Sequence, residues 1–149
     1  MALKEQVPNV YGVGLRNVGS YQVSGTPWVT GSAITQNKTQ RYEFPTVPKS
    51  FTVINTHAST EIYLHFHSQA TFTGVGGSDE QSYASGHRWR QNGHYITLGA
   101  GDTVSLNTKQ RYIYISEPNA GAGSFQIFAE LTNIPIGRMY ALTGSGIDE

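Results

Sequence analysis

Two histidines that stand two residues apart are the clearest candidates for chemistry in this sequence. His65 and His67 lie in a stretch where apolar and polar residues alternate, so a β-strand would point both imidazoles to the same face. Two imidazoles on one face are what a chelating pair needs, and a third could come from His94 or His57. The pair therefore raises a metal-site hypothesis, which depends on whether further ligands follow.

The pair resembles the start of the metal motif of cupins, in which a glutamate follows the second histidine by three or four residues. Here those positions are Ala70 and Thr71, and Glu80 comes only after a glycine-rich stretch. Two imidazoles alone leave a metal site short of ligands. We therefore expect no metal and no cofactor, and we interpret His65 and His67 as polar-face residues of a half-exposed strand that share a face with a neighbouring tyrosine.

Other catalytic patterns are missing from the sequence. There is no Gly-x-Ser-x-Gly elbow, and the glycine-rich stretch 74–77 lacks the Lys-Ser/Thr ending of a phosphate-binding loop. The adjacent acids Asp79 and Glu80 fall in an expected loop, where two solvated carboxylates are the ordinary outcome. We expect no catalytic residues and no enzyme activity.

The most unusual local cluster is Arg88-Trp89-Arg90. An exposed tryptophan between two arginines would suit stacking on a sugar ring or a hot spot for a protein partner, so it is a candidate surface contact cluster. The alternative is that Trp89 is buried at the rim of the fold while both arginines extend to water.

Side chains alternate with period two through much of the chain, and no stretch has the apolar stripe of a helix. The alternation is clear in the stretches 62–67, 95–98, 103–106, 112–115 and 125–132. Turn-forming residues separate them at 74–79, 99–102 and 117–121. Six to eight short strands spaced in this way predict an all-β fold, an antiparallel jelly-roll-like β-sandwich.

The composition is that of a domain that packs against neighbours. The 149 residues predict one domain, and the lack of cysteine excludes disulfides and thiolate metal sites. Ten basic residues balance ten acidic ones, which argues against nucleic-acid and membrane partners. Charged residues make up 13% of the chain, about half the usual ~25%. No stretch has the apolar run of a secretory signal or a transmembrane span, so we expect a soluble protein that is not exported.

Both ends of the chain differ from the rest. Residues 1–31 place five glycines among large apolar side chains, and residues 135–149 mix turn residues with apolar ones in the same way. Two interpretations of residues 1–31 stay open: a glycine-rich first strand pair of the sandwich, or an extended arm that orders against a partner. The candidate partner-binding residues of the arm are Tyr11, Leu15, Tyr21, Val23, Trp28 and Val29.

The stretch from Val10 to Ser32 resembles the N-terminal signature of small virion structural proteins of tailed phages, particularly marine and cyanobacterial ones. It contains Tyr-Gly-Val-Gly-Leu-Arg-Asn-Val-Gly-Ser-Tyr-Gln-Val-Ser-Gly-Thr-Pro-Trp-Val-Thr-Gly. Less specific likeness continues at 44–45, 49–55, 94–98, 113–116, 129–135 and 142–146. The resemblance implies a capsid cement or decoration protein, made in the host cytoplasm and bound to the outside of the major-capsid shell.

We therefore predict an N-terminal arm at 1–32, a β-sandwich domain at 33–134 and a C-terminal tail at 135–149. The expected partners are the major capsid protein and further copies of this chain in a homotrimer. One alternative function is a carbohydrate-binding adsorption module on the virion surface, which would use Trp89 and nearby tyrosines. The other is a cupin-like metalloenzyme at the two histidines. If residues 1–31 form an arm, their deletion should leave the sandwich folded and Trp28→Ala should change the melting temperature little.

Overall fold

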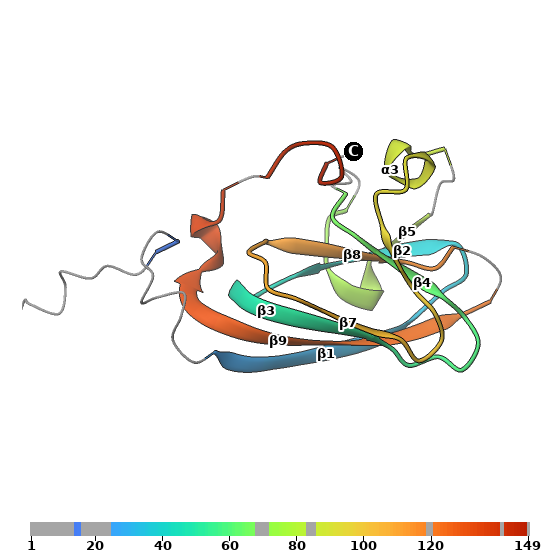
Figure 1. Cartoon of the computed structure of the whole chain (residues 1–149), viewed down its shortest axis with the longest axis horizontal. Coiled ribbons are helices and arrows are strands. Elements are labelled where there is room, and N and C mark those ends of the chain that lie inside the picture. The colour runs from blue at the N-terminus through green and yellow to red at the C-terminus, as the bar shows by residue number, and fades with distance from the viewer. Residues whose placement is uncertain are drawn as a thin grey trace, which may run out of the picture.

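The computed structural model describes residues 14–15, 25–67, 72–82, 86–118, 121–140 and 142–148. Two antiparallel sheets pack face to face, so the protein is an all-β sandwich, as the alternation predicts (Figure 1). The lower sheet in this view has four strands in the order β1-β9-β3-β7, and the upper sheet has five in the order β5-β2-β8-β4-β6.

The strands differ greatly in length. The four-stranded sheet contains β1 (Thr26–Ile34), β9 (Gly123–Pro135), β3 (Thr46–Asn55) and β7 (Thr103–Leu106). The five-stranded sheet contains β5 (Glu80–Ser82), β2 (Lys38–Glu43), β8 (Tyr112–Ser116), β4 (Ile62–His65) and β6 (Ile96–Leu98). The described helical elements are the single-turn helix α3 (Arg88–Gln91) and the 3-10 turns η2 (Gly76–Ser78) and η3 (Ile136–Arg138).

The strand pairing is nested, which is the topology of a jelly roll. The first strand pairs with the last, β1 with β9, and the pairs β2–β8, β3–β7 and β4–β6 follow inside it. The chain is thus one long hairpin rolled into two sheets, with β5 added at an edge beside β2. This arrangement confirms the predicted jelly-roll-like class.

The core lies between the two sheets and is built by the inward side chains of the alternating strands. Its buried members include Ile34, Phe44, Phe51, Val53, Ile62, Leu64, Ile113, Ile115, Phe125 and Ile127. Trp28 packs against this cluster, with its ring 5.4 Å from that of Phe44 in an edge-to-face contact. The first strand therefore contributes a large aromatic side chain to the core.

The position of β1 corrects the predicted domain boundary. The boundary expected between residues 32 and 33 falls inside this strand, which begins at Thr26 and pairs with β9 along its whole length. Glycine permits the close pairing, because a Cβ at Gly31 would lie only 2.8 Å from the carbonyl oxygen of Phe125. Residues 26–32 therefore belong to the sandwich and not to an arm.

A second, smaller apolar cluster joins segments from both ends of the chain. Val47, Ile134 and Met139 are buried there, and Leu15, Ile136 and Leu142 pack against them. The predicted tail therefore begins inside β9, whose last residue is Pro135, and its next turn, η3, stays attached to the sandwich.

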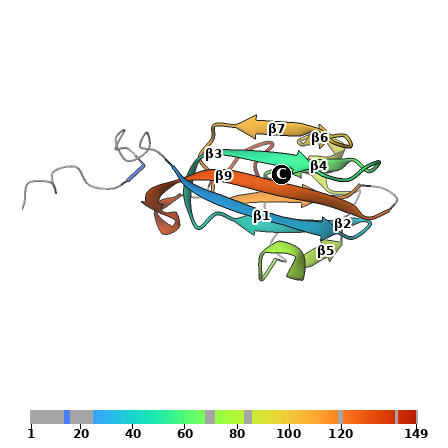
Figure 2. The same ribbon diagram turned by 90° about the horizontal axis from the view of Figure 1, so that it is seen from below.

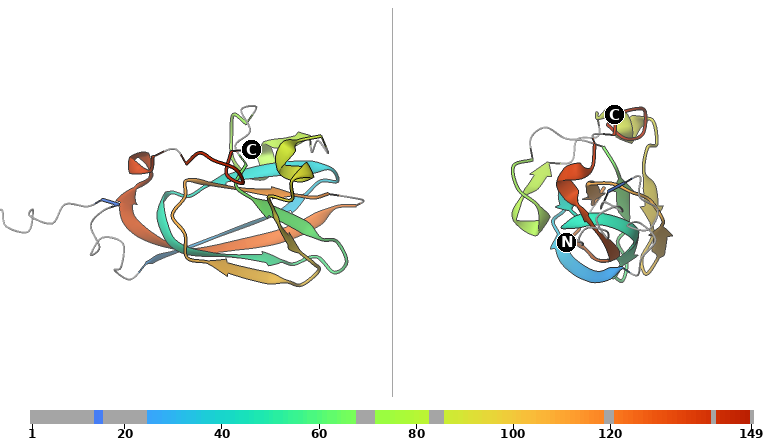
Figure 3. Two further views of the ribbon diagram at one scale, coloured as in Figure 1. Left: turned by 45° about the horizontal axis from the view of Figure 1, so that its top comes forward. Right: turned by 90° about the vertical axis from the view of Figure 1, so that its left-hand side faces the viewer.

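The outer surfaces of the two sheets differ in how they are covered. In the tilted view of Figure 3, α3 and the C-terminal segment lie over the five-stranded sheet. Figure 2 looks onto the opposite side, where β7, β3, β9 and β1 run across the view. Among the described elements, none lies over the outer face of the four-stranded sheet.

Substitutions at two neighbouring positions of β1 test its place in the core. Trp28→Ala should lower the free energy of unfolding by about 2–4 kcal/mol, because it removes an aromatic side chain packed in the core. Val29→Thr, at a side chain that is 65% exposed, should change it by less than about 0.5 kcal/mol. Chemical denaturation measures both. Equally small losses would show that β1 is not part of the cooperative fold, as the arm interpretation requires.

Candidate binding surface

The structure separates the residues predicted for the arm. Trp28 faces the core, whereas Val29 points outward from the same strand, because neighbouring strand residues face opposite sides. Leu15 lies on the small cluster around Met139. The remaining predicted arm residues, Tyr11, Tyr21 and Val23, lie outside the described residues.

Val29 belongs to an open, uncharged surface on the four-stranded sheet, which we call the neutral face. The register places Val29 beside Phe128 of β9, Phe128 beside Thr52 of β3, and Thr52 beside Ser105 of β7. The next row along the strands follows the same order. It contains Gly31, Gln126, Ile54 and Thr103. With Ala33 and Ser124, which are also paired, these residues form the neutral face.

The chemistry of the neutral face is that of a surface suited to protein contact. None of its residues carries a charge, and Glu130 comes only beyond its edge on β9. Val29 and Phe128, which are 65% and 38% exposed, form an apolar pair at its centre. Around them the hydroxyls of Thr52 and Ser105 bond to each other at 2.8 Å. A partner that binds there would therefore desolvate no charged group of this face and few unpaired polar groups.

One border of the neutral face is the outer edge of β1, which η2 contacts at Ser32. This strand is the outermost of its sheet, so its backbone has a β9 partner on one side only. All nine residues of β1 are uncharged. Charged residues commonly protect exposed edge strands from further pairing, and β1 has none. The edge and the neutral face together form one continuous uncharged surface.

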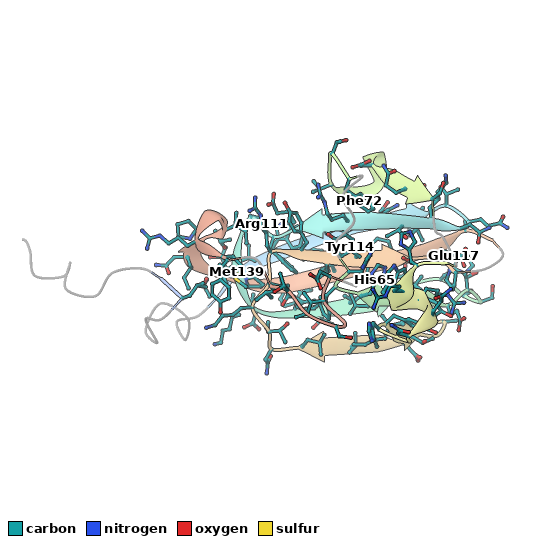
Figure 4. The ribbon with its side chains drawn as sticks, turned by 90° about the horizontal axis from the view of Figure 1, so that it is seen from above. His65, Phe72, Arg111, Tyr114, Glu117 and Met139 are labelled. Carbon is teal, nitrogen blue, oxygen red and sulfur yellow. The ribbon has the colours of Figure 1, made fainter. Side chains whose placement is uncertain are left out.

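The opposite side of the molecule carries the predicted histidines, and they are buried. His65 is 0% exposed and lies under α3, where its ring stacks on that of Trp89 with centroids 3.7 Å apart (Figure 4). Tyr114, the residue paired with His65 on β8, also lies nearly parallel to its ring, with centroids 5.5 Å apart. The expected half-exposed strand is therefore wrong, because α3 brings a covering side chain from outside the sheet.

His65 ends a short chain of buried hydroxyl groups. Its Nε2 lies 2.7 Å from Ser116 Oγ, which lies 2.7 Å from Thr39 Oγ1. Burial, followed by the neighbouring His67 and His87, holds the pKa of His65 well below the ordinary value of 6.5. A serine beside a neutral imidazole has the composition of a nucleophile and its base. Here both residues are 0% exposed, so a substrate cannot reach them and the chain of hydroxyls fixes β2, β8 and β4 to one another.

The candidate cluster at residues 88–90 is not a surface contact cluster, because its central residue is buried. Trp89 is 0% exposed, and only Arg88 is fully on the surface. Arg90 turns back over the sheet, with its guanidinium 5.2 Å from the ring of Tyr63 and 5.6 Å from that of Tyr95. These contacts make the cluster a cover for the five-stranded sheet.

The two acids expected to be solvated in a loop instead hold backbone in place. Asp79 accepts hydrogen bonds from the backbone N–H groups of Gly74 and Thr73. These hydrogen bonds, of which that from Gly74 has the larger effect, lower the pKa of Asp79. Glu80, in β5, accepts from Gln40 at 2.6 Å and from the Thr35 backbone. Asp79 therefore stabilises the connection between β4 and β5, and Glu80 holds β5 to β2 and to the β1–β2 connection.

No group of three or more His, Cys, Asp or Glu residues is placed to hold a metal ion within the part of the chain that the structure describes. The expected absence of a metal at His65 and His67 stays a prediction. In that same part of the chain, no helix has the length and apolar character needed to cross a bilayer.

Sequence reasoning did not identify the neutral face, although a signal for it was present. The alternation at 125–132 places Gln126 and Phe128 opposite the core residues. What the pattern lacks is the identity of the neighbouring strands, since their outward residues come from positions far apart in the sequence.

The buried state of His65 leads to a pH-dependent stability. As pH falls below about 6.5, the unfolded chain binds a proton at this residue that the folded protein excludes, so the free energy of unfolding should fall. At pH 5 the loss relative to pH 7 should be measurable and at most about 2 kcal/mol, the limit set by the ordinary pKa of 6.5 in the unfolded chain.

Denaturation of His65→Gln at both pH values should show a smaller pH dependence than that of the wild type. An unchanged pH dependence in His65→Gln would show that the buried imidazole is not the group responsible.

Comparison with known proteins gives only distant structural likeness. No family model and no curated protein matches the sequence. One similar solved structure is described as the crystal structure of PirA; the match covers 70% of this chain and 95% of that chain, with 12% identity and a TM-score of 0.41. Another comes from work on Bacillus endospore appendages that form disulfide-linked pili. That match covers 73% of this chain and 91% of that chain, with 12% identity and a TM-score of 0.35.

Proposed function

We propose that this protein is a structural component of a tailed-phage virion, a cement or decoration protein that binds the outside of the major-capsid shell through its neutral face. The sequence resemblance supplies the class of partner. The observation that carries the proposal is the open, uncharged outer surface of β1, β9, β3 and β7, with Val29 and Phe128 at its centre.

An uncharged sheet face suits attachment to a broad protein surface. Affinity in such contacts comes from a few well-buried apolar anchors surrounded by residues that exclude water. Phe128 and Val29 supply the anchors, and the small residues Gly31 and Ala33 let a partner approach the backbone of β1. Because charge contributes little, attachment should persist over a wide range of salt concentration.

The carbohydrate-binding alternative loses the side chain on which it was based. Trp89 is fully buried, so it cannot serve as a stacking platform. The nearby tyrosines are engaged as well, since Tyr63 stacks on Tyr95 with centroids 4.0 Å apart and Arg90 lies over both rings. We therefore favour a protein partner over a glycan. The homotrimer stays a prediction, to be measured by sedimentation.

A charge placed on the neutral face should weaken attachment without unfolding the protein. Phe128→Lys should weaken binding to capsids that lack the protein by at least about tenfold, because a lysine at the centre of the contact must be desolvated without a partner charge. Co-sedimentation measures binding, and the melting temperature checks that the fold is retained. The wild type should bind about equally well in low and high salt.

The matched control is Gln91→Lys, which adds the same charge on α3, on the opposite side of the sandwich, and should bind as the wild type does. If Gln91→Lys loses attachment while Phe128→Lys keeps it, the protein binds through its other side. If neither form nor the wild type binds capsids, the proposed function is wrong.

A further inference from the structure

A groove at one end of the five-stranded sheet is not explained by the proposed function. It has a volume of about 380 Å³ and lies between the β7–β8 connection, the start of β8 and the C-terminal segment. Figure 4 shows two of its borders, Arg111 and Met139, at the opposite end of β8 from His65. Its walls are mostly apolar and include Phe66, Tyr112, Met139, Tyr140, Leu142 and Ile147.

One wall of the groove holds a buried hydrogen-bond donor for which the described part of the chain supplies no acceptor. Gln110 is 5% exposed, and its Oε1 accepts a hydrogen bond from the Thr108 hydroxyl at 2.6 Å. Its Nε2 has no hydrogen-bond partner among the described residues. An unpaired buried amide N–H costs free energy, and a carbonyl oxygen inside the groove would satisfy it. The groove is therefore suited to a ligand with an apolar body and a carbonyl group, which is the chemistry of a peptide.

The N-terminal part of the chain reaches this groove. Lys109, another lining residue, donates from Nζ to the backbone carbonyl of Leu15 at 3.2 Å. Leu15 also packs on the cluster that contains Met139, and a Cβ at Gly14 would lie 3.7 Å from Nη1 of Arg138. Gly14 and Leu15 thus tether the chain beside the groove.

Residues 6–13 have the composition that this groove would select. They are Gln-Val-Pro-Asn-Val-Tyr-Gly-Val, a run without charge that carries three valines and a tyrosine. Residues 6–13 directly precede Gly14, so this segment is joined to the part of the chain that lies beside the groove. The tether also gives the segment a high effective concentration, on the order of millimolar, at the groove of its own chain.

We propose that the groove is a peptide-binding site for residues 6–13 of the same chain, with a backbone carbonyl of this segment accepting the free N–H of Gln110. The inference concerns the isolated protein and does not depend on the capsid. It assigns Tyr11, Val10 and Val13 to an intramolecular contact on the five-stranded sheet, on the side away from the neutral face.

Disulfide trapping in the full-length protein tests this contact cleanly, because the natural chain has no cysteine. The test variant combines Asn9→Cys with Tyr140→Cys, at a groove residue that is 66% exposed. The control combines Asn9→Cys with Asn133→Cys, an exposed position beside Ile134 of the cluster on which Leu15 packs, and outside the groove lining. Under mild oxidation, the first pair should form an intramolecular disulfide at least about tenfold faster than the second.

Three results would overturn the proposal: equal rates for the two pairs, no disulfide at Tyr140→Cys, or disulfide-linked dimers in place of the intramolecular product. The dimers would assign the groove to a neighbouring copy.

A second measurement needs only Asn9→Cys, labelled with a nitroxide. The label should broaden the amide resonances of Gln110 and Tyr112 in the monomer and leave those of Gln126, on the neutral face, unchanged; equal broadening at both sites would contradict the proposal.

Replacement of Gln110 separates the role of its free N–H from that of its carbonyl oxygen. Gln110→Met removes the donor and should slow disulfide formation in the first pair severalfold. Thr108→Val removes the internal hydrogen bond to Gln110 Oε1 but keeps the donor, and should slow it less. Equal effects would show that Gln110 only supports the groove wall and does not bind the segment.

Discussion

The two-sided alternation of β9 is the constraint on which this structure depends. Its inward residues, among them Phe125 and Ile127, are buried in the core, while Gln126 and Phe128 point to solvent. A shift of one residue in its pairing would exchange these two sets, so burial of the core residues fixes the register. Since β9 pairs with both β1 and β3, the same register aligns the outward residues of three strands into the neutral face.

The nested strand order explains why the N-terminal segment cannot be divided from the sandwich at residue 32. In a rolled hairpin the first strand pairs with the last, so β1 lies against β9 although almost a hundred positions separate them in the chain. Trp28 completes the core from this strand, and Val29 completes the exposed surface. One strand thus links stability to the proposed attachment, through side chains that face opposite ways.

The sequence contained enough information to predict the fold class and several strands. The stretches at 62–67, 95–98, 103–106, 112–115 and 125–132 alternate clearly, and β4, β6, β7, β8 and β9 lie within or overlap them. The place of β1 was left open between a first strand of the sandwich and an arm, because its proline and glycine are typical of turns. The structure supports the strand interpretation for residues 26–31, whose distant pairing partner was not predicted. The local sequence pattern also could not predict the burial of His65 and Trp89. Their burial depends on α3 packing over β4, a strand that lies more than twenty residues earlier in the chain.

The orientation of the protein on its partner tests the central claim most directly. A density map of virions that carry this protein would show which surface faces the shell. The account predicts that β1, β9, β3 and β7 lie against the major capsid protein, with Phe128 in the contact and α3 pointing away from it. Density that placed α3 and the C-terminal segment against the shell, with the neutral face in solvent, would contradict it.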